Sequence, residues 1–134
     1  CPCAMEVIRK IDNYSEKAVP PTHNQRNITT LMMEVPGEDR SVDANDLIDI
    51  AERSFSIPTY GILKRREEGN LVFDAHKNPK FVEDVVRDIL NAILKKYKKL
   101  PDDVLIVVRS ESEESIHKHN AFAERVTTIG ELRK

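Results

Sequence analysis

Residues 78–108 read NPKFVEDVVRDILNAILKKYKKLPDDVLIVV, and this stretch decides the fold class. Asn78 and Pro79 are typical of a helix start, with asparagine as the N-cap and proline in the first turn. One apolar face then continues at helical spacing to about Lys99. It comprises Val82, Val85, Val86, Ile89, Ile93 and Tyr97. Pro101 ends this helix, and the apolar run 104–108 predicts a buried strand.

The residues before this stretch predict a strand and a second helix. Residues 27–35 alternate in a way that places apolar side chains on both faces of a strand. Asp43 is a plausible N-cap for a helix over 44–55, which Pro58 ends. Residues 59–76 are rich in charge and allow no definite prediction.

The two ends of the chain complete the predicted order. Residues 4–11 suit a short helix, 13–22 a loop and 116–128 a final strand. The order β-α-α-β-β predicts an α+β fold, with two helices packed on one face of an antiparallel sheet. Three strands leave an open edge, so we expect a first strand upstream of residue 1. Because the chain begins at Cys1 without Met, we also expect residues 1–134 to be a single unit of a longer polypeptide.

Composition excludes several classes of protein. The chain has 134 residues, of which 40% are hydrophobic, so it can form one core. A net charge of -2 disfavours a nucleic-acid binder, and no apolar run approaches the ~18 residues of a membrane span. Cys1 and Cys3 are too close for an unstrained disulfide, so we expect an intracellular, cytoplasmic protein without a disulfide framework.

The histidines and cysteines suggest a metal site. His117 and His119 are two residues apart on the predicted strand and would share a face, and Cys1 and Cys3 have the same spacing. Thiolate, imidazole and carboxylate donors together favour Zn(II) or Fe(II) over Mg(II) or Ca(II). Taken singly, each side chain is more often an ordinary surface group.

Four blocks of sequence, taken together and in order, carry a family resemblance. They are Cys1 to Glu6 with His23-Asn24-Gln25-Arg26, then Tyr60 to Glu68, Asn78 to Arg87, and Glu114 to Ala121. From Cys1 to about Ala123 the chain resembles the type IB GTP cyclohydrolases and their archaeal relatives of the methanopterin pathway. The resemblance implies a tunnelling fold (T-fold), which has a four-stranded antiparallel sheet with two helices between its second and third strands. It further implies the C-terminal unit of a two-unit chain, and a homo-oligomer, most simply a tetramer, with sites at subunit interfaces.

The resemblance implies one divalent metal per site, held by Cys1, His23, Glu68 and His117. Fe(II) is favoured, and Zn(II) or Mn(II) also suits these ligands. Such an ion activates water, which here would add to C8 of the guanine ring of GTP and lead to release of C8 as formate. Glu114 and His119 would transfer protons. Spacing alone does not tell which of the two neighbouring histidines ligates, and the family pattern favours His117.

The remaining expected site residues would bind GTP. Glu83 matches the family's purine anchor, since a carboxylate can accept hydrogen bonds from guanine N1–H and the exocyclic amine. Its alternative role is to complement the dipole at a helix N-terminus. Arg26, Lys64 and Arg65 are candidates for the triphosphate, although Lys64 and Arg65 also suit an exposed basic run. His76 has no counterpart in these blocks, and we expect it on the surface.

The resemblance leaves the product open. Alanine in Cys1-Pro2-Cys3-Ala4 favours the archaeal enzymes, which form 7,8-dihydroneopterin 2′,3′-cyclic phosphate. The type IB enzymes form 7,8-dihydroneopterin triphosphate instead. A purine- or pterin-binding T-fold module without hydrolysis is a further alternative.

Overall fold

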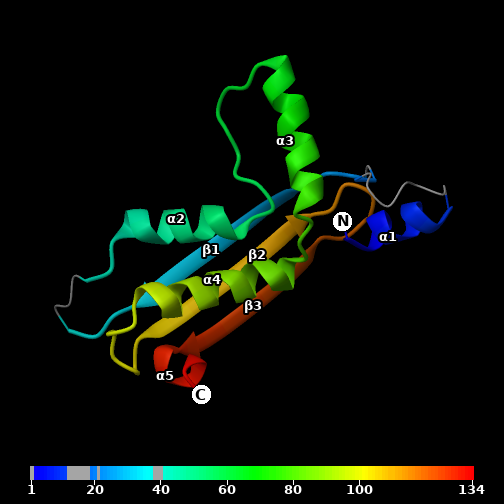
Figure 1. The fold of residues 1–134 in the computed structure, drawn as a ribbon. Coiled ribbons are helices and arrows are strands. Elements are labelled where there is room, and N and C mark those ends of the chain that lie inside the picture. Colours follow the sequence, from blue (N-terminus) through cyan, green and yellow to red (C-terminus); the bar gives the residue numbers. More distant parts are fainter. Residues whose placement is uncertain (1, 12–18, 21, 38–40) are drawn as a thin grey trace.

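The computed structural model describes residues 2–11, 19–20, 22–37 and 41–134. Its three-stranded antiparallel sheet has the order β1-β2-β3 and is covered by helices on one face (Figure 1). The strands are β1 (Arg26–Glu34), β2 (Leu105–Glu113) and β3 (Ala121–Thr128). The helices are α1 (Pro2–Ile11), α2 (Ala44–Ser54), α3 (Arg65–Lys77), α4 (Val82–Lys96) and α5 (Ile129–Leu132). This confirms the predicted α+β class and agrees with a tunnelling-fold arrangement.

The strand register places functional segments at one end of the sheet. Arg26 at the start of β1 pairs with Glu113 at the end of β2, and Glu34 pairs with Leu105. Ser112 in turn pairs with Ala121 at the start of β3. The segment before β1 and the β2–β3 connection therefore meet at the same end.

The core lies between the sheet and helices α2 and α4. Helix α4 packs on β2 and β3, while α2 contacts β1 and α4. Ile89 and Ile93 of α4 are fully buried against Ile106 and Val108 of β2. The α4 stripe predicted from residues 82–97 is thus confirmed as core, because its period brings every third or fourth residue onto the sheet.

The opposite face of the sheet carries exposed apolar side chains. Ile28 and Met32 on β1, and Phe122 and Val126 on β3, are each more than half exposed. The Arg109 guanidinium lies 3.9 Å from the centre of the Phe122 ring on the same strand pair. We call the face formed by Ile28, Met32, Phe122 and Val126 the uncovered sheet face.

Several element boundaries differ from the prediction. Helix α4 begins at Val82, not at Asn78, and residues 65–77 form the additional helix α3. The reason is local: the residue before a proline avoids helical conformation, so Asn78 becomes the C-cap of α3 and Phe81 the N-cap of α4. Three helices rather than two therefore separate β1 from β2, and α3 stands off the sheet (Figure 1).

The C-terminal third differs at three points. Strand β2 extends beyond the predicted run to Glu113, and β3 begins at Ala121 rather than at residue 116. The short helix α5 was not predicted, and Thr128 caps it by accepting a hydrogen bond from the Glu131 backbone. None of the helices within the described ranges is long and apolar enough to cross a bilayer.

Truncation of the α4 stripe tests this core. Ile89→Ala should lower the free energy of unfolding by about 2–5 kcal/mol, because a fully buried side chain leaves a cavity. Ile62→Ala is the matched control, since Ile62 is 94% exposed and its truncation should cost less than about 0.5 kcal/mol. Urea unfolding measures both, and equal losses would contradict the assigned core.

Candidate functional site

A histidine and a glutamate meet where β1 begins and β2 ends. His23 lies three residues before Arg26, and Glu114 directly follows β2. Their Nε2 and Oε2 atoms are 4.0 Å apart, and the two side chains are only 13% and 12% exposed. The antiparallel register brings them together across 91 residues of sequence (114 − 23).

The His23 ring has one satisfied and one unsatisfied nitrogen. Its Nδ1 lies 3.3 Å from the Thr22 hydroxyl. Its Nε2 is buried and has no hydrogen-bond partner in the described structure. Buried polar atoms are normally paired, and an unpartnered imidazole nitrogen beside a carboxylate suits a divalent cation. The donor chemistry at this point therefore fits the predicted metal.

Gln25 fixes the position of Glu114. Its side-chain Nε2 donates to Glu114 Oε1 at 2.8 Å and to Ser112 Oγ at 2.6 Å. The Glu114 backbone N–H donates to Asn120 Oδ1 at 3.2 Å. These contacts leave Glu114 Oε2 on the side of His23. Residue type and spacing predicted no role for Gln25 or Asn120, although both belong to blocks that carry the resemblance.

The two histidines of the β2–β3 connection do not lie on a strand, and that prediction was wrong. His117 and His119 precede β3, which begins at Ala121. The connection is closed instead by Asn120, which bonds both to the Glu114 backbone and to Glu111 Oε1. The two exposed rings nevertheless lie together, with centroids 5.4 Å apart and planes at 18°.

The N-terminal turn of α3 holds three other predicted residues away from His23. Lys64, Arg65 and Glu68 are all exposed there. Glu68 lies about 12 Å along the helix axis from His76. His76, in the last turn of α3, contacts Thr22, the residue directly before His23. Among the described residues, no group of three or more potential ligands gathers at one point. Cys1 lies outside the described residues.

Arg26 and Glu83 approach the same end of the sheet from different elements. Arg26 is exposed at the first position of β1, three residues after His23. Glu83 is exposed in the first turn of α4. No hydrogen bond or ion pair involves the Glu83 carboxylate in the described structure, so it is available to a ligand.

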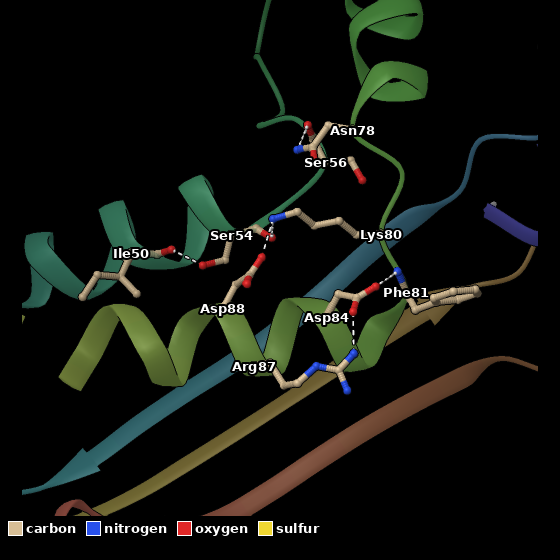
Figure 2. A network of polar contacts seen from close by, with 9 residues as sticks. All are labelled: Ile50, Ser54, Ser56, Asn78, Lys80, Phe81, Asp84, Arg87 and Asp88. Carbon is tan, nitrogen blue, oxygen red and sulfur yellow. Dashed lines mark hydrogen bonds and ion pairs between the residues drawn. The ribbon is translucent and has the colours of Figure 1, made fainter. Parts of the chain in front are cut away.

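The start of α4 is held by a polar network (Figure 2). Asp84 accepts a hydrogen bond from the Phe81 backbone N–H at 2.9 Å and pairs with Arg87. These two contacts, the Phe81 bond first, hold the pKa of Asp84 below its ordinary value. Asp84 thus caps the helix, while Glu83 and Asp84 both lie in the first turn, where a carboxylate complements the helix dipole.

Lys80 connects the same turn to α2. Its ammonium donates to the Ser54 carbonyl at 2.9 Å and to Asp88 at 2.6 Å (Figure 2). The Asn78 amide also donates to the Ser56 carbonyl, at 3.1 Å. The turn that presents Glu83 is therefore anchored to the end of α2.

His76 is buried rather than on the surface, which corrects the prediction. Only 7% of it is exposed, in the last turn of α3. The reason is that the C-terminal end of α3 returns to the start of β1 (Figure 1). There the His76 ring contacts the Thr22 backbone. Periodicity in 59–76 could not reveal this contact, because the partner is 54 residues away.

The cap of α4 should depend on pH. The pKa of Asp84 is lowered below 3.8 in the folded chain, so its contribution to stability is complete above the unfolded pKa. That contribution is lost as the pH falls through the folded pKa. Asp84→Asn should cost at most about 1 kcal/mol near pH 6 and make the loss of stability towards about pH 2.5 smaller. Urea unfolding at both pH values measures this, with Asp103→Asn as the exposed control, and an unchanged pH dependence in Asp84→Asn would refute it.

Comparison with known proteins identifies the family. The family model described as type I GTP cyclohydrolase folE2 matches residues 1–123. GTP cyclohydrolase MptA of Methanobrevibacter smithii is 46% identical over 100% of this chain and 47% of its own length. MptA of Methanothermobacter thermautotrophicus is 46% identical over 99% of this chain and 46% of its own length. MptA of Methanocaldococcus jannaschii is 41% identical over 100% of this chain and 47% of its own length. The chain spans about half the length of these curated relatives. Its match to the model and to these relatives places it in the type I GTP cyclohydrolase folE2 family.

Proposed function

We propose that this chain forms part of a metal-dependent GTP cyclohydrolase, which opens the imidazole ring of guanine and releases C8 as formate. The names of the relatives support the substrate and the reaction. The single observation that carries the proposal is the buried pair of His23 and Glu114, in which His23 Nε2 has no hydrogen-bond partner. A free imidazole nitrogen that can bind a metal, beside a carboxylate that can accept a proton, suits metal-assisted hydrolysis.

Cys1, His23, Glu68 and His117 would hold the metal. One thiolate, two imidazoles and a carboxylate suit Fe(II), with Zn(II) or Mn(II) as substitutes. When bound, the ion supplies the Lewis acidity that activates water. Of these four ligands, His23 has the clearest support, because its Nε2 is buried and has no hydrogen-bond partner among the described residues.

Glu114 and His119 would move the protons. Release of C8 as formate breaks both bonds from C8 to the ring nitrogens, and each cleavage consumes one water. In each step the water loses a proton and the nitrogen that leaves C8 gains one. Glu114 is fixed by Gln25 and faces His23, so it is placed to accept a proton beside the metal. His119 stacks on His117 and is exposed, so it can exchange protons with solvent.

Glu83, Arg26, Lys64 and Arg65 would bind GTP. The Glu83 carboxylate accepts hydrogen bonds from the guanine edge, and the rigid turn formed by Asp84 and Lys80 presents it. The three cations are exposed and complement the triphosphate charge. Within one chain, Arg26 lies near His23, whereas Lys64 and Arg65 lie at the far end of α3.

A complete site needs more than one chain. Glu68 lies about 12 Å along α3 from His76, the residue that contacts the segment before His23. We therefore expect an assembled site to combine α3 of one protomer with His23 of another. The uncovered sheet face offers an apolar surface for this association. We therefore propose a homo-oligomer, most simply a tetramer, with the site shared across an interface.

The product we propose is 7,8-dihydroneopterin 2′,3′-cyclic phosphate. The archaeal MptA relatives, at 40–46% identity, favour it over the linear triphosphate of the type IB enzymes. Both products require the same ring opening, so the assignment of His23 and Glu114 does not depend on this choice.

Incubation with GTP tests the reaction. The chain with Fe(II) under anaerobic conditions should release formate and a cyclic-phosphate pterin, both detected by mass spectrometry. A triphosphate pterin would assign the type IB product instead. Intact GTP with metal bound, at protein concentrations that sustain the oligomer, would show that residues 1–134 do not carry out the reaction alone.

A substitution at Glu83 tests the guanine anchor. Glu83→Gln keeps the shape but replaces one acceptor oxygen by a donor, so GTP affinity should fall about tenfold or more. Glu52→Gln, at an exposed glutamate of α2, should bind GTP like the wild type. Calorimetric titration with GTP measures both, and equal affinity in the two variants would remove Glu83 from the site.

A further inference from the structure

We infer that His76 is a positioning residue, which acts through Thr22 to orient the His23 ring and to leave its Nε2 unprotonated. The inference rests on the proposed function in one respect, namely that His23 is a metal ligand. It assigns a task to the one buried histidine that neither the resemblance nor the proposed site uses.

The contacts of His76 fix its own ring first. Its Nδ1 lies 2.7 Å from the Val72 carbonyl oxygen, one turn earlier in α3. A carbonyl only accepts, so Nδ1 carries a proton and the ring orientation is set by the helix itself. The ring is 7% exposed, so it has little room to turn away.

The other nitrogen of His76 holds the Thr22 backbone. Its Nε2 lies 3.1 Å from Thr22 N and 3.0 Å from Thr22 O. In the neutral ring Nε2 accepts from the Thr22 N–H, and in the doubly protonated ring it donates to the carbonyl. Either form fastens the residue before His23 to the end of α3, beside Pro20, which is fully buried.

Thr22 then controls His23. Its Oγ1 lies 3.3 Å from His23 Nδ1. If the hydroxyl accepts the Nδ1 proton, the neutral His23 ring keeps a free lone pair on Nε2, the atom that is buried without a partner. A residue that hydrogen-bonds to a metal-ligating histidine orients its ring, and removal of such a residue typically lowers metal affinity 10–100-fold.

The chain of contacts also gives α3 a role in the site. Val72, His76, Thr22 and His23 form one continuous path from the helix to the unpaired nitrogen. Helix α3 stands off the sheet and carries the proposed ligand Glu68 at its other end (Figure 1). A displacement of α3 would therefore move His23 as well as Glu68.

The tautomer of His23 is the first readout, and it needs no metal and no GTP. Long-range ¹H–¹⁵N NMR of the metal-free chain should show His23 protonated on Nδ1 and bare on Nε2. Thr22→Val removes the hydroxyl but keeps the backbone bond to His76, and it should shift His23 towards the other tautomer. Thr22→Ser restores the hydroxyl and should restore the wild-type signals.

Zinc affinity is the second readout, measured by competition with a chromophoric chelator. Thr22→Val and His76→Phe should each bind Zn(II) about tenfold more weakly or worse, whereas Thr22→Ser should stay within about twofold of wild type. Lys77→Gln is the matched control on α3, since Lys77 is exposed and its described contacts are with Asp74 and the Phe73 ring. Circular dichroism checks that His76→Phe folds. If it does not fold, the Zn(II) affinity of Thr22→Val still tests the inference.

Two results would overturn the inference. One is a wild-type His23 protonated on Nε2, and the other is a tautomer that Thr22→Val leaves unchanged. If the wild type binds no Zn(II), the proposed ligand set fails, and the tautomer measurement decides the role of His76 and Thr22 by itself. A purely structural role of His76 would lower stability without shifting the His23 signals in the folded variant.

Discussion

The antiparallel pairing of β1 with β2 determines where the polar groups of the candidate site lie. Its register sets the residues before Arg26 against those after Glu113. It also divides the helix-covered face into two zones. Ile106 and Val108 form an apolar zone under α4, whereas the polar zone nearer the site is joined by side-chain hydrogen bonds. Those bonds link Thr29 with Ser110, Ser110 with Asn27, Gln25 with Ser112, and Gln25 with Glu114.

The polar zone beside the candidate site consists of buried hydroxyls that are hydrogen-bonded. Ser110 and Ser112 are almost fully buried, and each has a hydrogen-bond partner across the strand pair. Buried hydroxyls are tolerated when they are paired, so the sheet extends its ladder to Glu113 beyond the last apolar residue. His23 Nε2 is the exception among the described buried side-chain atoms, which is why it marks the site.

Helices α4 and α3, which carry Glu83 and Glu68, are anchored to the rest of the chain to different degrees. The start of α4 is fixed by Asp84, Lys80 and Asn78, so Glu83 is presented from a rigid turn (Figure 2). Helix α3, in contrast, is tied to the sheet end mainly through His76. The proposed ligand Glu68 therefore lies on a helix with few described contacts to the sheet, at the end away from His76, as a site shared between protomers would require.

The sequence by itself determined the α+β class, the amphipathic stripe of α4, the Asp43 cap of α2 and the buried run at the start of β2. These features rest on periodicity and local capping, which a single segment carries. The family was also readable from four local blocks. Only the tertiary structure decided that residues 65–77 form a helix, that His117 and His119 lie in a connection, and that His76 is buried against Thr22. The burial of His76 and the approach of Glu114 to His23 depend on partners 54 and 91 residues away in sequence, and no local pattern records such contacts. Helix α3 is mostly exposed and so has no apolar stripe that would reveal it, and Asn120 closes the connection through contacts with Glu111 and Glu114 that residue spacing does not show.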